Sequence, residues 1–194
     1  MASKIKIKVD QLETADGSGT IALQNQLSGM TTASLPALGS AQMPTGSVLQ
    51  VTQGVLTSTF SFTGSTTWTD TGVTANITPS STSSKILVMV SCALGMSVSA
   101  VNVRLRIVRD GSTVVGSPTG GGDSFSHREQ NQSGNLYTRF LESYQYLDSP
   151  SSTSQETYKV QMYRNTSTGT AYLNRGDADQ SRQYSTITLM EIAG

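Results

Sequence analysis

Charge, histidine and cysteine are all scarce in this sequence, and each shortage excludes a class of function. Charged residues form 13% of the chain, against a usual share of about 25%, and they balance to a formal net charge of zero. No overall field therefore draws the chain to nucleic acid or to a membrane surface. The single histidine excludes a histidine-based metal cluster, and the single cysteine cannot form an internal disulfide. The chain also lacks the run of about 18 apolar residues that a membrane-spanning helix needs.

The familiar catalytic motifs are missing as well. The chain has no Gly-x-Ser-x-Gly nucleophile elbow, no P-loop and no dinucleotide-binding fingerprint. No pair among its 13 acidic residues stands out as the two carboxylates that a glycosidase needs. We therefore predict a non-enzymatic protein that uses neither a metal nor a cofactor. A polysaccharide-degrading enzyme is the outside alternative.

Serine and threonine are abundant instead, and together they account for 55 of the 194 residues. Hydrophobic residues reach 36%, below the usual share of about 45–50%. Threonine suits strands because its branched Cβ packs well on a pleated sheet. The composition indicates a β protein with a hydroxyl-rich surface, and it also suits a subunit that hides part of its surface in an assembly.

Strand patterns are clearest between residues 60 and 110. The apolar residues between Val101 and Ile107 alternate with polar ones, which predicts a strand with one dry face and one wet, basic face. Residues 85–94 are apolar almost throughout, as expected of a strand that is covered on both sides. Cys92 lies in this run and is predicted to be a small, buried core residue. Asp110-Gly111 predicts a tight hairpin, because both residues tolerate a positive φ.

The spacing of strands and turns predicts the fold class. About eight or nine strands fit into roughly 140 residues, which favours an all-β, antiparallel sandwich of jelly-roll type. An immunoglobulin-like sandwich, with about seven shorter strands, is the second choice. We expect two parts, an extended N-terminal anchoring segment at residues 1–50 and the sandwich at residues 51–194.

The N-terminal segment carries apolar side chains that have no core of their own. Ile5, Ile7 and Val9 alternate with lysines, and one such strand cannot bury its apolar face alone. We predict that it adds to the sheet of a partner protein; an ordinary edge strand of the sandwich is the alternative. Beyond it, Pro and Gly interrupt the chain every few residues, and apolar residues recur between them. Their predicted role is burial against neighbouring chains, above all for Leu27, Leu35 and Leu38. The first residues lack the apolar stretch of a secretory signal, so we expect assembly in a cytoplasm.

One long loop is predicted at residues 117–134, and a loop of that length is usually functional or disordered. Counting strands places it at the end of the sandwich that points away from the anchor, whereas the segment 175–181 falls at the near end. The loop offers polar side chains to a hydroxyl-rich ligand, and the candidate receptor contacts are His127, Arg128, Glu129 and Asn131. A loop that binds nothing is the alternative.

Trp68 and the seven tyrosines are the other conspicuous residues. An apolar body with a polar tip suits strand ends and subunit interfaces, which is the simpler interpretation. The sharper alternative is that one of these rings stacks against a carbohydrate.

Two stretches resemble a known group of proteins. Residues 3–19, SKIKIKVDQLETADGSG, are similar to the N-terminal segment of small fibre-like and decoration-type structural proteins of tailed bacteriophages, especially marine ones. Residues 69–88, TDTGVTANITPSSTSSKILV, resemble a second block of the same proteins, and the terminal ITLMEI at 187–192 also fits.

This resemblance implies a virion protein that is usually a homotrimer. We expect it to be assembled in the cytoplasm of a host bacterium and to contact other virion proteins of the tail or capsid. The leading hypothesis is a tail-fibre-type appendage whose β domain touches a host-surface glycan. The alternative is a capsid decoration or cement protein that stabilises the phage head.

Overall fold

The structure is a computed structural model of the chain, which divides into two compact units at residues 1–38 and 39–194. The described residues are 39, 42–64, 66–97, 102–116, 124–129, 138–165, 169–175 and 183–194. The predicted anchor residues Ile5, Ile7, Val9, Leu27, Leu35 and Leu38 lie outside them, as does Asn131. The division into an anchor and a sandwich therefore stays a prediction.

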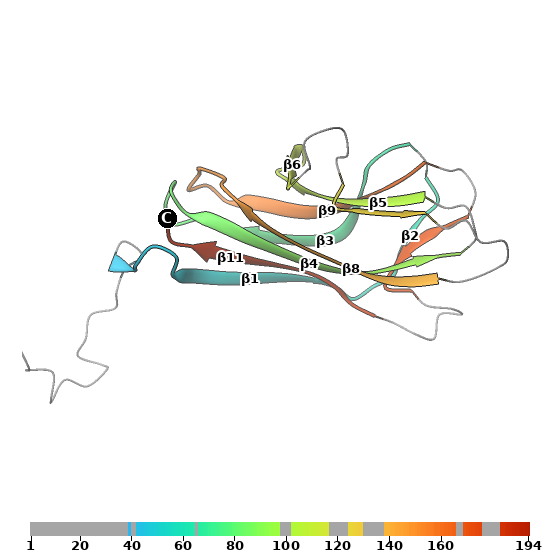
Figure 1. The fold of residues 1–194 in the computed structure, drawn as a ribbon, viewed down its shortest axis with the longest axis horizontal. Coiled ribbons are helices and arrows are strands. Elements are labelled where there is room, and N and C mark those ends of the chain that lie inside the picture. The colour runs from blue at the N-terminus through green and yellow to red at the C-terminus, as the bar shows by residue number, and fades with distance from the viewer. Residues whose placement is uncertain are drawn as a thin grey trace, which may run out of the picture. The chain divides into compact units, whose positions relative to one another are not determined.

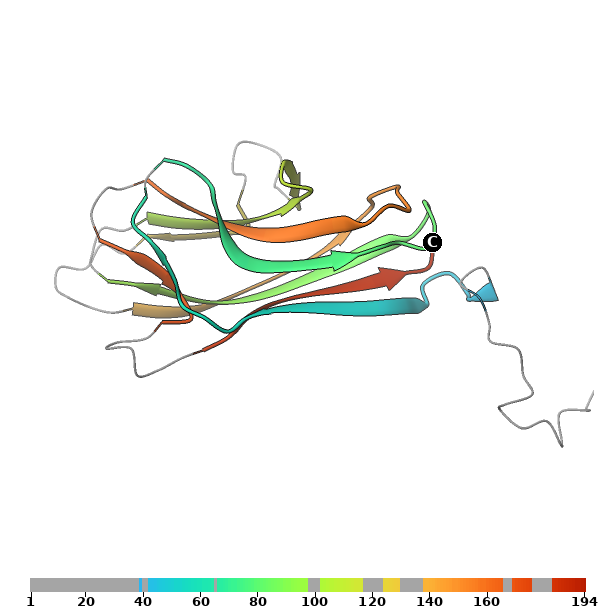
Figure 2. The same ribbon diagram turned by 180° about the vertical axis from the view of Figure 1, so that it is seen from behind.

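Residues 39–194 form two antiparallel sheets, which lie as two layers in Figures 1 and 2. The first sheet contains β1 (Val48–Leu56), β11 (Ser185–Ile192), β4 (Lys85–Met96) and β8 (Thr138–Asp148), in that order. The second contains β3 (Thr69–Ile77), β9 (Glu156–Arg164) and β5 (Asn102–Arg109), with β6 (Thr113–Val115) and β7 (Ser126–Glu129) both paired to β5. Two short strands, β10 (Ala171–Leu173) and β2 (Phe60–Phe62), extend the first sheet beside β4.

The strand order is that of a jelly roll. If β6 and β7 count as one interrupted strand, the eight long strands alternate between the sheets except at the β5 hairpin. The predicted all-β, antiparallel jelly-roll-type sandwich is therefore confirmed. No helix in the described part of the chain is long and apolar enough to cross a membrane.

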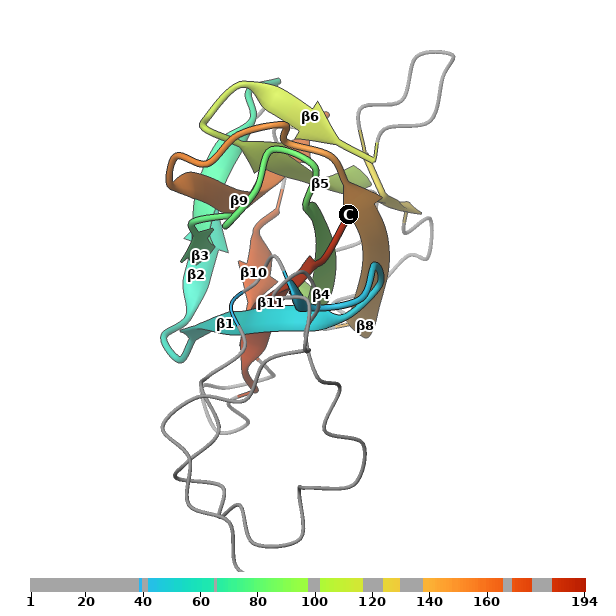
Figure 3. The same ribbon diagram turned by 90° about the vertical axis from the view of Figure 1, so that its left-hand side faces the viewer.

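The two ends of the sandwich differ. The turn end, which faces the viewer in Figure 3, carries the short turns at 78–84, 110–112 and 149–155 together with the C-terminal residue. The hairpin at Asp110-Gly111 is confirmed, with φ values of 50° and 80°. The opposite end, called the loop end, receives the connections from β4 to β5 and from β7 to β8.

Two sequence predictions about the connections are wrong. Residues 117–134 are not one loop, because residues 126–129 form β7 and pair with β5. The segment 175–181 does not start from the turn end, because β10 and β11 follow one another along the same edge of β4. The predicted order of connections assumes that every strand crosses the sandwich, but the short β10 does not.

The core lies between the sheets, and its residues come from the inward positions of alternating strands. Val73, Val88 and Leu105 have no exposed surface, and neither does Cys92. The prediction for Cys92 is confirmed. Its burial raises the pKa of the thiol to about 12, so it stays a neutral core group and not a nucleophile.

The sheets meet closely along both sides. On one side Gln50 Nε2 donates to the carbonyl of Thr78 at 2.7 Å, and a β-carbon at Gly54 would collide with the carbonyl oxygen of Thr74. Glycine is therefore required where β1 passes β3. On the other side, Tyr144 Oη donates to the carbonyl of Gly116 at 2.6 Å. Such contacts leave the two outer faces of the sandwich as its main open surfaces.

Candidate functional site

The predicted receptor residues lie on β7, at the edge of the second sheet. Arg128 is exposed, but its Nε lies 2.5 Å from Oε1 of Glu142 on β8, and its guanidinium lies 4.8 Å from the ring centroid of Phe140. Glu142 also accepts a hydrogen bond from Ser126 Oγ at 2.8 Å. Arg128 thus joins the two sheets. A receptor contact by His127, Arg128 or Glu129 stays a prediction.

A denser group of functional side chains lies on the outer face of β3, β9 and β5. Trp68 and Tyr163 have ring centroids 5.2 Å apart, and the guanidinium of Arg106 lies 4.3 Å from the Trp68 ring. Arg104 lies 5.8 Å from the ring of Tyr163. All four side chains are partly exposed. We call these four residues the aromatic–arginine platform.

The register of the strands assembles the platform. Arg104 and Arg106 occupy the wet face of β5 that the alternating pattern predicts, and Tyr163 pairs directly with Arg104. Trp68 immediately precedes β3, the neighbour of β9. On the far side of β5, Arg104 pairs with His127 of β7, so one predicted receptor residue is in register with the platform.

A ladder of polar contacts holds the platform from its turn-end side. Arg106 Nε donates to Gln161 Oε1 at 2.9 Å, and Gln161 Nε2 donates to Asp70 Oδ1 at 2.7 Å. Lys159 Nζ donates to the other Asp70 oxygen at 2.8 Å. Hydrogen bonds from Lys159 and Gln161 lower the pKa of Asp70, which is therefore ionised at neutral pH. The amide of Gln161 thus fixes Arg106 relative to Trp68.

Two buried polar atoms on this face have no hydrogen-bond partner within the described structure. They are Oδ1 of Asn102 and Nε of Arg104. Asn102 is 7% exposed and lies two residues before Arg104, on the same outward side of β5. An unsatisfied buried acceptor or donor costs about 1–3 kcal/mol. A ligand that forms hydrogen bonds with these two atoms would remove this cost.

Sequence reasoning found parts of this platform without joining them. It singled out Trp68 as a possible carbohydrate-stacking ring, and it recognised the basic face of β5. It missed Tyr163 as the partner of Trp68, because the register between β3 and β9 decides which residues meet.

The outer face of the first sheet is different, because it carries many exposed aliphatic side chains and almost no charge. Val51, Leu141 and Leu147 are 54%, 68% and 46% exposed, and Leu87 and Met89 are partly exposed. Among the outward side chains that the structure describes on the four long strands, Lys85 alone is charged. The apolar face, as we call it, consists of Val48, Val51, Val55, Leu87, Met89, Leu141, Leu147, Met190 and Ile192.

A third feature is a buried carboxylate at the turn end. Glu191 is 1% exposed, and its Oε1 accepts hydrogen bonds from the backbone N–H and Oγ of Ser80 and from Ser84 Oγ, each at 2.7 Å. Its Oε2 accepts one from Gln50 Nε2 at 2.6 Å. Burial alone would raise the pKa of Glu191, but these hydrogen bonds outweigh it and hold the pKa below its ordinary value. The ionised carboxylate ties the turn at 78–84 to β1 and β11.

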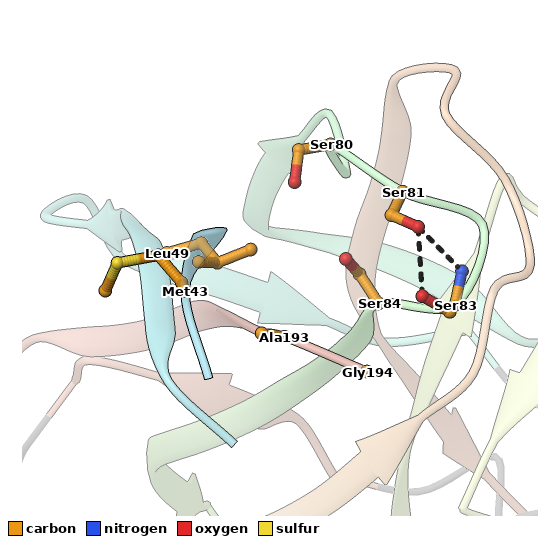
Figure 4. Close-up of a pocket in the computed structure, with 8 residues that line it drawn as sticks. All are labelled: Met43, Leu49, Ser80, Ser81, Ser83, Ser84, Ala193 and Gly194. Carbon is orange, nitrogen blue, oxygen red and sulfur yellow. Dashed lines mark hydrogen bonds between the residues drawn. The ribbon is translucent and has the colours of Figure 1, made fainter. Parts of the chain in front are cut away.

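Beside this carboxylate lies a pocket of about 320 Å³, shown in Figure 4. Ser81 Oγ and Ser83 Oγ lie 2.9 Å apart, and the backbone N–H of Ser83 donates to Ser81 Oγ. No residue that lines the pocket has an acidic or basic side chain, so the lining offers no acid–base pair. The lining residues are Met43, Leu49, Ser80, Ser81, Ser83, Ser84, Ala193 and Gly194.

Comparison with known proteins finds no sequence relative and a weakly similar solved structure. No family model and no curated protein matches the chain. Among solved structures, a chain in the structure of the infectious bursal disease virus Gx strain is similar, with a TM-score of 0.37 and 13% sequence identity. The match covers 82% of this chain and 43% of that chain, so this chain spans less than half of its length.

Proposed function

We propose that this chain is a non-enzymatic structural protein of a bacteriophage virion. It is a homotrimeric, tail-fibre-type appendage that attaches through its N-terminal segment and exposes the jelly roll for contact with a host-surface glycan. The resemblance of residues 3–19 and 69–88 to phage fibre-like proteins supports the virion assignment. The proposed trimeric state also comes from this resemblance, because the similar phage proteins are usually homotrimers.

The observation that carries the assembly is the apolar face. Val51, Met190, Leu87 and Leu147 form an unbroken aliphatic row across all four strands, and Val48 and Ile192 lie beside its end. Monomeric proteins rarely expose contiguous apolar patches above a few hundred Å², and larger patches usually mark interfaces. We assign this face to contact with further copies of the same chain. Val48 lies on this face and is 51% exposed in the single subunit, so a second copy could bury it.

The first expected result is a trimeric mass. Light scattering of the full-length protein at micromolar concentration should give three times 20.5 kDa. The physical reason is burial of the apolar face, since each aliphatic side chain that becomes fully buried contributes about 1.5–3 kcal/mol. A stable mass of 20.5 kDa would refute self-assembly. A mass of twice that value would keep the interface but refute the threefold arrangement.

The second expected result concerns location on the particle. Gold-labelled antibody against residues 51–194 should bind at the phage tail, where an attachment protein contacts its host. Antibody against a known major capsid protein serves as the control for the head. Label distributed over the head instead would favour the alternative, a capsid decoration or cement protein. Absence of label from intact virions that are shown to contain the chain would mean that the sandwich is not exposed.

A further inference from the structure

We propose that the aromatic–arginine platform is a binding site for an acidic saccharide, a polymer of carboxylated sugars such as uronic or sialic acids. The inference rests on the proposed function in one respect, since it names the glycan class and the site that the exposed jelly roll would use. It places the contact surface on the platform, whereas the sequence predicts His127, Arg128, Glu129 and Asn131. The outer face of β3, β9 and β5 provides three things that such a ligand needs.

The first is an aromatic surface. Trp68 and Tyr163 lie next to one another with centroids 5.2 Å apart and planes inclined at 40°. Aromatic rings with a polar edge suit ligands that present both an apolar face and hydroxyl groups, as pyranose rings do. Binding sites in general combine such rings with a few well-placed polar groups.

The second is positive charge. Of the outward side chains that the structure describes on β3, β5 and β9, three are cationic and only Asp70 is anionic. Lys159 is paired with Asp70, whereas Arg104 has a ring contact but no acidic partner in the described structure. An arginine fork matches a carboxylate with two parallel hydrogen bonds. In a chain whose net charge is zero, this local excess selects an anion.

The third is unused hydrogen-bonding capacity. Asn102 Oδ1 is an acceptor without a donor, and Arg104 Nε is a donor without an acceptor. A carboxylated sugar supplies both partners, because its hydroxyls donate and its carboxylate accepts. A carboxylate that draws Arg104 away from Tyr163 gives Nε its missing acceptor. A neutral sugar also carries hydroxyl oxygens that accept, but only the carboxylate adds a negative charge and the paired oxygens that match the arginine fork, so the site should favour the acidic sugar.

The experiment uses the intrinsic fluorescence of Trp68, the only tryptophan in the chain. Because Arg106 lies over this ring, a ligand that moves the arginines changes the emission of the platform itself. The full-length protein is titrated with hexagalacturonate and with a hexamer of sialic acid. Maltohexaose is the neutral control, and a thymidine hexanucleotide tests for binding of any polyanion.

We expect a saturable change with at least one acidic saccharide, and none with maltohexaose or the oligonucleotide. Arg104→Gln should weaken binding about tenfold or more, as expected for loss of a charge-assisted bidentate contact. Arg104→Lys, which keeps the charge without the fork, should fall between the two. The matched control is Arg175→Gln, which removes an arginine that lies 4.6 Å from the Tyr172 ring beside the other sheet. Its affinity should stay within about twofold of wild type.

The proposal fails if neither acidic saccharide gives a saturable change, or if the oligonucleotide binds equally well. It also fails if Arg104→Gln, with wild-type circular dichroism, binds as tightly as Arg175→Gln. Light scattering on the same samples separates this failure from failure of the proposed function. A trimer that does not bind acidic saccharides overturns the site assignment and leaves the appendage proposal standing.

Discussion

Glu191→Ala is expected to lower the free energy of unfolding by about 3 kcal/mol at neutral pH. The carboxylate is 1% exposed and accepts four hydrogen bonds from Gln50, Ser80 and Ser84. Its removal leaves these donors without their acceptor and separates the turn at 78–84 from β1 and β11. Urea denaturation followed by circular dichroism measures the change. The matched control is Asp70→Asn, since Asp70 is also hydrogen-bonded but its side chain is 46% exposed. Asp70→Asn should lower the free energy of unfolding by less than about 1 kcal/mol.

The same carboxylate gives the stability a defined pH dependence. Hydrogen bonds hold the pKa of Glu191 in the folded protein below its ordinary value of 4.5. A group whose folded pKa is depressed contributes stability above its unfolded pKa and loses that contribution as the pH falls through the folded pKa. The wild-type protein should therefore lose stability from about pH 5 downward, and Glu191→Gln should lack this component. Equal acid sensitivity in wild type and Glu191→Gln would contradict the assignment.

The fold class could be predicted because the local signals agree with one another. The strict alternation in β5 fixes which side chains face the core, and the Asp110-Gly111 turn fixes its hairpin. The apolar run at 85–94 predicts a strand, and this strand is β4, which pairs with β11 on one side and β8 on the other. Short connections between strongly patterned strands leave few arrangements other than a sandwich.

The connections could not be predicted, because they depend on pairing between distant strands. β7 is four residues long and is stabilised by its ladder to β5, so its own sequence carries little strand signal. β10 has only three residues; the sequence predicts a strand that crosses the sandwich, but β10 shares the edge of β4 with β11. A count of strands therefore gave the wrong starting point for the segment that follows β10.

The candidate site shows the same division between local and distant information. The basic face of β5 was visible as a pattern, but Trp68, Tyr163 and Arg104 come together only through the ladders of β9. The apolar run at 85–94 was expected to be covered on both sides. In the described structure of one subunit the core covers one side, and Leu87 and Met89 remain partly exposed on the other. The apolar pattern of β4 thus suits burial of its outer side chains, Leu87 and Met89, against a neighbouring copy of the chain.

Leu87→Glu is therefore expected to convert the proposed trimer into a monomer. Leu87 lies in a row that crosses all four strands, because it pairs with Met190 and Leu147, and Met190 pairs with Val51. A carboxylate at this position would be buried without a partner in the assembly, and an unpaired buried charge costs about 3–5 kcal/mol. In the separate subunit the same position is partly exposed, so the new charge stays hydrated and the fold is retained.

Light scattering and circular dichroism together give the result. The mass should fall to 20.5 kDa while the β spectrum stays that of wild type. Thr74→Glu is the matched control, because it adds the same charge at an exposed position on β3, on the outer face of the other sheet. It should leave the mass unchanged. A Leu87→Glu protein that keeps its full mass would show that the apolar face is not the interface between copies. If Thr74→Glu also dissociates, the second sheet, and with it the saccharide platform, lies within the assembly instead of facing the host.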